Sequence, residues 1–477
     1  MTRLPAPRQW EWSALLPIAA GLYALTAASG WGWWLFAGLP GWLVLASGTA
    51  LLLMPGDPRI TSYLGLGAAL GLLLALPAMG AGGFFEGLFG GALFAGSFLV
   101  AGRVGLEREP LAPGAPAPLT DLTLQAKAGL DEAVLGFFLI SARVPSGLEA
   151  ERMCEEALAL AQTLRQKGWI ADPAAAHATP EAPRSVQILG GQWRGQDYEK
   201  VSFDSGYCPD PDLPGAARWA NHGPPQRAHA RVLRHAGEPR PWLICIHGYR
   251  MGTPLTDFSL FPPAVLHQRL GLNLLMPTLP LHGERRIGRL SGDHYLDGDL
   301  LDLLFAQSQA LWDLRRWVAW IRSVDEQPRI GVYGISLGGY NTALLSQYEA
   351  GLDFVLAGIP VVDLATALWR FLPPAHRAYF AERGLDEAVY REVLTPVSPL
   401  ARPCLLEERQ RHLVAATGDR IVVPAQPLLL ERHWGVPLRW YQGSHLSIRG
   451  EREVRLALRE AMDRAGWRQP DPVFETA

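Results

Sequence analysis

Ser336 occupies the middle of the string GISLG at residues 334–338, a G-x-S-x-G pattern. A serine in this pattern acts as a nucleophile when it lies on a sharp turn between a strand and a helix, because the glycines permit the turn and leave the hydroxyl exposed. The apolar run RIGVYG precedes Ser336 and is typical of a buried strand, and LGGYNTALLSQY follows it and is typical of a helix. The alternative interpretation is a turn serine without a catalytic function. The presence or absence of catalytic partners elsewhere in the chain distinguishes the two.

The partners that such a serine requires are found further along the chain. A serine hydroxyl is a weak nucleophile at neutral pH and needs a neighbouring base, which a third group orients. His445, in YQGSHLS, directly follows the last expected strand, and Asp419, in AATGDRIVVP, ends the strand before it. The chain order Ser336, Asp419, His445 is the order of nucleophile, acid and base that a G-x-S-x-G hydrolase needs.

With these motifs the sequence resembles the α/β-hydrolase superfamily over roughly residues 198–466. The resemblance rests on the GISLG, GDRIVVP and GSH turns and on HGYR after the third core strand. It implies that Ser336 is the nucleophile, His445 the general base and then acid, and Asp419 the residue that orients the imidazole. Some members of the superfamily carry the acid one strand earlier, so Asp363 in PVVDLA is the alternative acid.

The oxyanion that forms when a carbonyl is attacked needs preorganised donors, usually two backbone N–H groups. Leu337 directly follows the serine at the start of the expected helix and is one candidate. By resemblance, the backbone of Tyr249 in ICIHGYR is the other. We expect His247 in the same string to shape the loop rather than to act as a second base.

The string LPLHGERR at residues 279–286 follows the fourth core strand and points to the same edge of the sheet. His282, Arg285 and Arg286 therefore either line the substrate pocket or hold this loop by ion pairs. Residues 361–398 form an insertion with apolar and aromatic residues at helical spacing. By resemblance this insertion is a cap over the site, and a peripheral helical subdomain is the alternative.

The elements that must position these residues alternate between strands and helices from about Tyr198 onward. Two half-buried strands, YEKVSFDSGY and RAHARVLRHA, come first, and short apolar runs separated by helical patterns follow. This alternation predicts an α/β fold with one mostly parallel, doubly wound sheet and a helical cap insertion.

The N-terminal region has a different composition, because only Asp57, Arg59 and Glu86 are charged between Glu11 and Arg103. Four apolar stretches, near residues 13–29, 33–54, 60–79 and 87–101, predict an all-α region of about four transmembrane helices. A cleaved signal peptide would have a single apolar stretch.

With four spans, Arg3, Arg8, Arg59, Arg103 and Arg108 all fall on one side of the membrane. The positive-inside rule then predicts a multi-pass protein of the cytoplasmic membrane, with the catalytic domain on the cytoplasmic side. Fusion or loss of one span would place that domain on the opposite side.

These patterns predict four segments along the chain. A transmembrane helical region covers residues 1–109, and a Pro/Ala-rich linker covers 110–120. A helical connector covers 121–197, and the catalytic domain covers 198–470.

Composition excludes several other classes of function. A net charge of -3 without a long basic run speaks against nucleic acid as a partner. The four cysteines are widely spaced and form no zinc motif or disulfide framework. No HExxH, phosphate-loop or dinucleotide motif occurs, so we expect no metal and no cofactor.

The sequence thus predicts a membrane-anchored serine hydrolase that cleaves a carboxylic ester through an acyl-enzyme. Its expected partners are the bilayer and a small-molecule or lipid-like ester, and the sequence indicates no oligomeric state. Alternatives are an acyltransferase with the same three residues and a non-catalytic membrane scaffold that keeps the fold. Transport through the spans is disfavoured, because no ionisable residue lies near their centres.

Overall fold

The computed structural model describes residues 10–27 and 30–467. Arg3, Arg8, residues 28–29 and residues 468–470, which the sequence analysis uses, lie outside the described residues. The chain divides into two units, which are described separately. The helical unit comprises Met1–Ser141, Ala416–Pro424 and Gln442–Gly450, and the sheet unit comprises Ala142–Ala415, Ala425–Tyr441 and Glu451–Ala477.

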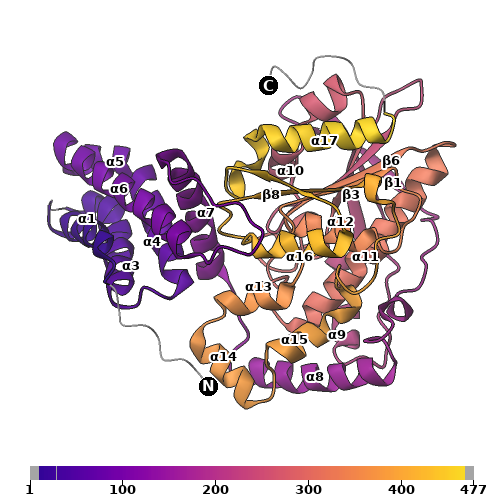
Figure 1. Ribbon diagram of the computed structural model, residues 1–477, viewed down its shortest axis with the longest axis horizontal. Helices are drawn as coiled ribbons and strands as arrows, with labels where there is room; N and C mark the ends of the chain where they lie inside the picture. The colour runs from indigo at the N-terminus through magenta and orange to yellow at the C-terminus, as the bar shows by residue number, and fades with distance from the viewer. Residues whose placement is uncertain (1–9, 28–29, 468–477) are drawn as a thin grey trace. The chain divides into compact units, whose positions relative to one another are not determined.

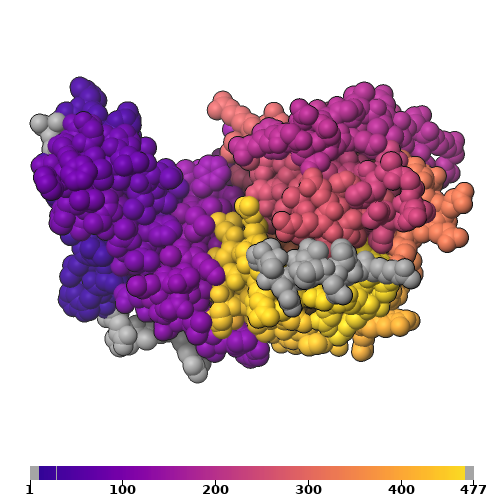
Figure 2. All heavy atoms as spheres, turned by 90° about the horizontal axis from the view of Figure 1, so that it is seen from above, coloured from indigo at the N-terminus to yellow at the C-terminus, as the bar shows by residue number. Residues whose placement is uncertain are grey.

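The helical unit is built from apolar helices that pack side by side in Figure 1, and its residues up to Ser141 are indigo to violet there and in Figure 2. Its core is lined mainly by small residues and a few large ones such as Trp33 and Phe94. Its elements are η1 (Trp12–Ala14), α1 (Leu15–Thr26), α2 (Trp31–Trp33), η2 (Trp34–Gly38), α3 (Leu39–Leu53), α4 (Pro58–Leu73), α5 (Ala75–Gly82), α6 (Phe84–Arg108) and α7 (Leu122–Ser141).

The structure supports fewer membrane spans than the four that the sequence predicts. In the described part of the chain, two helices, Trp31–Leu53 and Phe84–Arg108, are long and apolar enough to cross a membrane. The third expected span is broken into α4 and α5, which are bent by 57°. Pro77 explains the bend, because it has no N–H for the carbonyl of Leu73 and its ring clashes with that carbonyl. The first expected span is a shorter apolar helix, Trp12–Thr26.

Helix α7 belongs to the helical unit by its contacts, whereas the sequence analysis assigns it to a connector over residues 121–197. Glycines allow its close approach to α4 and α6. A Cβ built on Gly136 would lie 2.3 Å from the carbonyl oxygen of Ser62 in α4, and one built on Gly102 of α6 would lie 2.0 Å from that of Gln125 in α7. The backbones are therefore in direct contact along both helices.

One end of the helical unit carries Arg59 and Arg108, two of the arginines that the sequence analysis uses for orientation. Arg108, at the end of α6, donates to the carbonyl oxygen of Pro55 in the α3–α4 connection at 2.6 Å and to Glu11, before α1, at 2.8 Å. Arg59, at the start of α4, follows that connection. The beginning of α1, the α3–α4 connection and the end of α6 thus lie together.

The sheet unit contains one mixed sheet, which within the described residues has nine strands in the order β1-β2-β3-β5-β4-β6-β7-β8-β9. The pairs β1–β2, β2–β3 and β3–β5 are antiparallel, and the pairs from β5 through β4, β6 and β7 to β8 are parallel. The strands are β1 (Gln187–Trp193), β2 (Gln196–Asp204), β3 (Arg227–Leu233), β4 (Trp242–Ile246), β5 (Asn273–Thr278), β6 (Ile330–Ile335), β7 (Phe354–Gly358), β8 (Arg411–Ala416) and β9 (Leu438–Tyr441).

Helices cover both faces of this sheet, with α10 and α17 on one face and α11, α12 and α16 on the other (Figure 1). The layered arrangement confirms an α/β-hydrolase-like fold, with β1 as a strand that lies within the expected connector. The helices and short turns are α8 (Gly147–Gln166), η3 (Pro173–Ala176), α9 (Ala216–Ala220), η4 (Pro224–Gln226), α10 (Pro254–Leu260), η5 (Ala264–Arg269), η6 (Gly283–Arg285), α11 (Leu300–Val324), α12 (Leu337–Leu345), η8 (Glu408–Gln410), α16 (Ala425–Trp434), η9 (Leu446–Gly450, in the helical unit) and α17 (Arg452–Arg464).

The insertion at residues 361–398 folds into short helices, α13 (Leu364–Phe371), α14 (Pro374–Glu382), α15 (Glu387–Val393) and η7 (Thr395–Val397). Helix α15 packs against α8, and Arg165 of α8 forms an ion pair with Glu392 of α15. The insertion is thus helical, as its spacing predicts, and α8 supports it.

Candidate active site

Ser336 lies at the turn between β6 and α12 in a strained backbone conformation, with φ 60° and ψ -116°. A positive φ is uncommon for a residue with a side chain and persists only where the surroundings enforce it. Gly338 permits the close approach of this turn to β4, because a Cβ at that position would lie 1.9 Å from the carbonyl oxygen of Ile246. The G-x-S-x-G string therefore forms the tight turn between strand and helix that its residue types predict.

The two candidate oxyanion donors come from segments that follow neighbouring strands. Leu337 follows β6, and Tyr249 lies in the loop after β4. Leu337 is the first residue of α12, where helix N–H groups lack helical partners. In the sheet register Ile246 pairs with Gly334, so the loop that begins at His247 leaves the sheet at the same edge as Ser336. A Cβ built on Gly248 would lie 3.5 Å from the Cβ of Ser336, which places the backbone just before Tyr249 next to the serine.

Asp419 and His445 are in direct contact within the helical unit. The two meet at 2.7 Å through the Nδ1 of His445 and the Oδ2 of Asp419. The other oxygen of Asp419 accepts from the backbone N–H groups of Ile421 at 2.9 Å and Val422 at 2.7 Å, which fix the carboxylate. Because Nδ1 donates to the carboxylate, Nε2 keeps its lone pair and can accept a proton.

The pKa of His445 is raised above its ordinary value of 6.5. Burial lowers the pKa, but the negative charge of Asp419, its hydrogen bond and the charge of Asp131 raise it, and their combined effect is larger. An imidazole in this environment is a stronger base than one in water.

A buried carboxylate that the sequence analysis does not single out lies against residues 442–446, the segment that carries His445, which we call the histidine loop. Asp131, in α7, accepts hydrogen bonds from the backbone N–H groups of His445 at 2.7 Å and Leu446 at 3.0 Å. It also accepts from the hydroxyl of Ser444 at 2.9 Å and from the backbone N–H of Arg420 at 3.2 Å. The signal available in the sequence is a pair of acids, DE at residues 131–132, inside an otherwise apolar helical pattern.

Asp363, the alternative acid, is held by groups of its own insertion. Its carboxylate accepts from the backbone N–H of Thr366 at 3.0 Å, which caps α13, and from Arg391 at 3.1 Å. The residue that contacts the imidazole of His445 is Asp419.

His247 and His282 are buried and serve neighbouring loops. His247 donates from Nδ1 to the carbonyl oxygen of Gly248 at 2.8 Å, and its Nε2 accepts from the backbone N–H of Leu279 at 3.1 Å. His282 donates from Nδ1 to Pro280 at 2.9 Å, and the ring centroids of the two histidines are 5.1 Å apart. Burial lowers the pKa of both imidazoles, which are therefore neutral. The contacts of His247 match the loop-shaping role expected for it.

Arg285 is also buried, and its contacts join three segments of the sheet unit. Its guanidinium donates to the carbonyl oxygens of Thr278 at 3.0 Å and Pro225 at 2.6 Å and to the carboxylate of Asp313 at 2.7 Å. Arg286 donates to the carbonyl oxygen of Gly283 at 3.0 Å. Of the two interpretations of this string, the one in which the arginines hold the loop matches these contacts.

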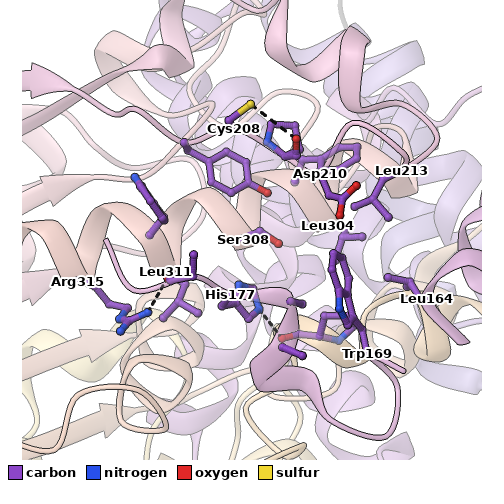
Figure 3. Close-up of a pocket in the computed structure, with 18 residues that line it drawn as sticks. Leu164, Trp169, His177, Cys208, Asp210, Leu213, Leu304, Ser308, Leu311 and Arg315 are labelled. Atoms are coloured by element: carbon purple, nitrogen blue, oxygen red, sulfur yellow. Dashed lines mark hydrogen bonds between the residues drawn. The ribbon is translucent and has the colours of Figure 1, made fainter. Parts of the chain in front are cut away.

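A separate pocket of about 240 Å³ opens in the sheet unit (Figure 3). It is bordered by α8, α11 and the segment around His177, whose Nε2 contacts the carbonyl oxygen of Pro396 at 2.8 Å. The residues lining it include none that the sequence analysis assigns to catalysis. Among residues 10–27 and 30–467, no cluster of three or more His, Cys, Asp or Glu side chains could hold a metal ion.

Solved structures with a similar arrangement include acetyl xylan esterase 1 from Thermoanaerobacterium sp. JW/SL YS485, with 15% identity and a TM-score of 0.42. That match covers 68% of this chain and 96% of the esterase. The acetyl xylan esterase from Paenibacillus sp. R4 has 16% identity and a TM-score of 0.40, over 65% of this chain and 93% of that one.

A comparison with protein-family models gives no match. Two Mycobacterium tuberculosis proteins align with this chain over 353 residues, the uncharacterized protein MT2702 at 35% identity and the uncharacterized protein Rv2627c at 34%. Each alignment covers 74% of this chain and 84% of the relative. The chain therefore belongs to the same family as these two mycobacterial proteins.

Proposed function

We propose that the protein is a membrane-associated serine hydrolase that cleaves a carboxylic ester through an acyl-enzyme. The observation that carries the proposal is the backbone of Ser336, held at positive φ between β6 and α12. In a G-x-S-x-G turn this strained geometry lifts the serine hydroxyl out of the strand end, where a substrate can reach it. The contact between Asp419 and His445 supplies an oriented base of the kind that a serine requires.

In the proposed reaction Nε2 of His445 takes the proton of Ser336 as Oγ attacks the ester carbonyl. The backbone N–H groups of Leu337 and Tyr249 donate to the oxyanion. His445 then protonates the leaving alcohol, and a water molecule, deprotonated by the same imidazole, releases the acid. Asp419 keeps Nδ1 protonated and stabilises the imidazolium that forms in both steps.

The proposal includes a membrane location, which the surface of the helical unit supports. Large apolar side chains are exposed on its helices, among them Leu73 at 75%, Leu76 at 76% and Phe85 at 77% of their area. Apolar surface of this extent is unfavourable in water and favourable in a lipid bilayer. A lipid-like ester is therefore the substrate class that we favour.

A fluorophosphonate probe tests the nucleophile directly in isolated membranes. We expect the wild-type protein to be labelled and Ser336→Ala to be unlabelled. Ser346→Ala is the matched control, because this buried serine near the end of α12 donates only to the carbonyl oxygen of Ala343, at 2.7 Å; we expect it to be labelled like the wild type. Folded wild-type protein that stays unlabelled would contradict the hydrolase and support the scaffold alternative.

A further inference from the structure

The histidine loop, which carries His445, is fastened by α7, which the sequence analysis assigns to the connector and which the structure places in the helical unit. All four groups that approach the carboxylate of Asp131 are donors: three backbone N–H groups, of Arg420, His445 and Leu446, and the hydroxyl of Ser444. A carboxylate has about four acceptor positions when it is ionised and loses one on protonation. Burial and the charge of Asp419 raise the pKa of Asp131 to about 7, and the charge of His445 and the backbone hydrogen bonds act against them, so the four donors meet a fully charged carboxylate above that pH.

This carboxylate joins the two segments on which the candidate base and acid lie. His445 lies in the loop after β9 and Leu446 begins η9 directly after it, whereas Arg420 directly follows Asp419 in the loop after β8. Backbone donors from both loops converge on one side chain, so the spacing between the loops depends on it.

A second set of contacts fixes the same region to the helical unit. The guanidinium of Arg420 donates to Glu132 of α7 at 2.8 Å and to Glu109 at 2.7 Å. Glu132 also accepts from the hydroxyl of Ser62 in α4 at 2.6 Å. These contacts join α7, which carries Asp131, to α4 and to the segment of Arg420.

We propose that Asp131 is a positioning residue for the hydrolase reaction: it fixes the loops of His445 and Asp419 and adds a negative charge that stabilises the imidazolium. This inference rests on the proposed function, because it assigns His445 as the base. It also gives the helical unit a part in catalysis in addition to membrane attachment.

The charges around His445 determine in which direction its pKa shifts when Asp131 is replaced. Within the helical unit, Asp419 and Asp131 are the ionisable groups that act on the imidazole of His445, and behind them Arg420 is neutralised by Glu132 and Glu109. Removal of the charge of Asp131 leaves Asp419 as the single stabilising carboxylate. The pKa of His445 must then fall, and the loop loses two of its anchors at the same time.

The test measures the rate of fluorophosphonate labelling of the full-length protein against pH. We expect Asp131→Asn to slow labelling about 10- to 100-fold, because a displaced base loses its alignment with the nucleophile. The pH at which the rate is half-maximal should also shift downward, which a purely structural role would not produce. Asp121→Asn is the matched control, because Asp121 caps the same helix through the N–H of Leu124 and asparagine caps equally well.

Ser444→Ala serves as a second variant should Asp131→Asn fail to fold. It removes one of the four donors and leaves the charge in place. We expect about fivefold slower labelling, the size of a typical net hydrogen-bond contribution.

The outcomes separate this inference from the proposed function. An unlabelled wild type would reject the proposed function itself. A labelled wild type together with Asp131→Asn at the wild-type rate and with the wild-type pH midpoint would overturn the role of Asp131 alone. If Asp131→Asn does not fold, a wild-type rate for Ser444→Ala would overturn it.

Discussion

At the scale of single residues, the orientation and charge of one imidazole govern the proposed chemistry. His445 donates from Nδ1 to Asp419 and is buried, and its pKa lies above 6.5 despite the burial. The neutral imidazole is the form that takes a proton from serine. Its raised pKa therefore makes the imidazole a stronger base. As the pH falls, the imidazole also becomes protonated, and so inactive as a base, at a higher pH than an ordinary histidine would.

The pH dependence of labelling follows from the upward shift in the pKa of His445. As pH falls through the raised pKa of His445, the imidazole becomes protonated and labelling of Ser336 is lost, so the half-maximal rate should lie above pH 6.5. Asp419→Asn should lower that midpoint and slow labelling by about 10³- to 10⁴-fold, because the imidazole loses its charge partner and its tautomer.

Asp363→Asn is the matched control for the acid. Its carboxylate caps α13, and asparagine preserves such a cap, so both the rate and the midpoint should stay unchanged. A midpoint at or below 6.5 in the wild type, or equal losses in the two variants, would contradict the assignment of Asp419.

At the scale of elements, the position of α7 depends on glycines that let backbones touch. Gly136 faces the carbonyl oxygen of Ser62 in α4, and the same helix carries Asp131 one turn earlier. The packing of α7 against α4 and the placement of the histidine loop are thus linked through a single helix.

Gly136→Ala tests this link. Its new Cβ would lie 2.3 Å from the backbone oxygen of Ser62, so α7 must move away from α4. We expect a loss of about 1–3 kcal/mol in the free energy of unfolding, the usual effect of overpacking, together with slower labelling. Thermal unfolding in detergent and probe labelling measure the two effects.

Gly80→Ala in α5 is the control for a glycine in the same unit. A Cβ at Gly80 meets nothing within 4 Å, so this variant should unfold and react like the wild type or be slightly more stable. Equal behaviour of the two variants would show that close contact between α4 and α7 is unimportant.

At the scale of the whole molecule, the arginine-bearing end of the helical unit determines the expected orientation in the membrane. Arg108 joins that end to Glu11 and Pro55, and the chain leaves α6 there. The positive-inside rule assigns this end to the cytoplasm, so we expect the sheet unit on the cytoplasmic side.

Cysteine accessibility tests the orientation. Cys208 is exposed in the sheet unit, Cys404 is partly exposed, and Cys154 and Cys245 are buried. In a Cys404→Ser background, a membrane-impermeant maleimide should label Cys208 in inside-out vesicles and not in intact spheroplasts of a bacterial host. Cys208→Ser in that background is the control for specific labelling, and reaction in spheroplasts would place the sheet unit outside.

The local chemistry was readable from the sequence because it depends on residue types at short spacing. The strand, turn and helix around Ser336 follow from an apolar run, two glycines and a helical pattern, and the structure has β6 and α12 there. The half-buried strands β2 and β3 were equally visible from their alternation. Strand β1 was not, because QILGGQW is an exposed edge strand with two glycines and no buried face.

The sequence by itself determined the order of nucleophile, acid and base along the chain and the apolar character of the N-terminal helices, since both are properties of the linear pattern. Only the tertiary structure decided that Asp419 rather than Asp363 contacts His445, that Pro77 bends one expected span, and that Asp131 holds the histidine loop. The physical reason is that a hydrogen bond between residues 131 and 445 depends on how close folding brings them, and their separation of 314 positions leaves no trace in local periodicity.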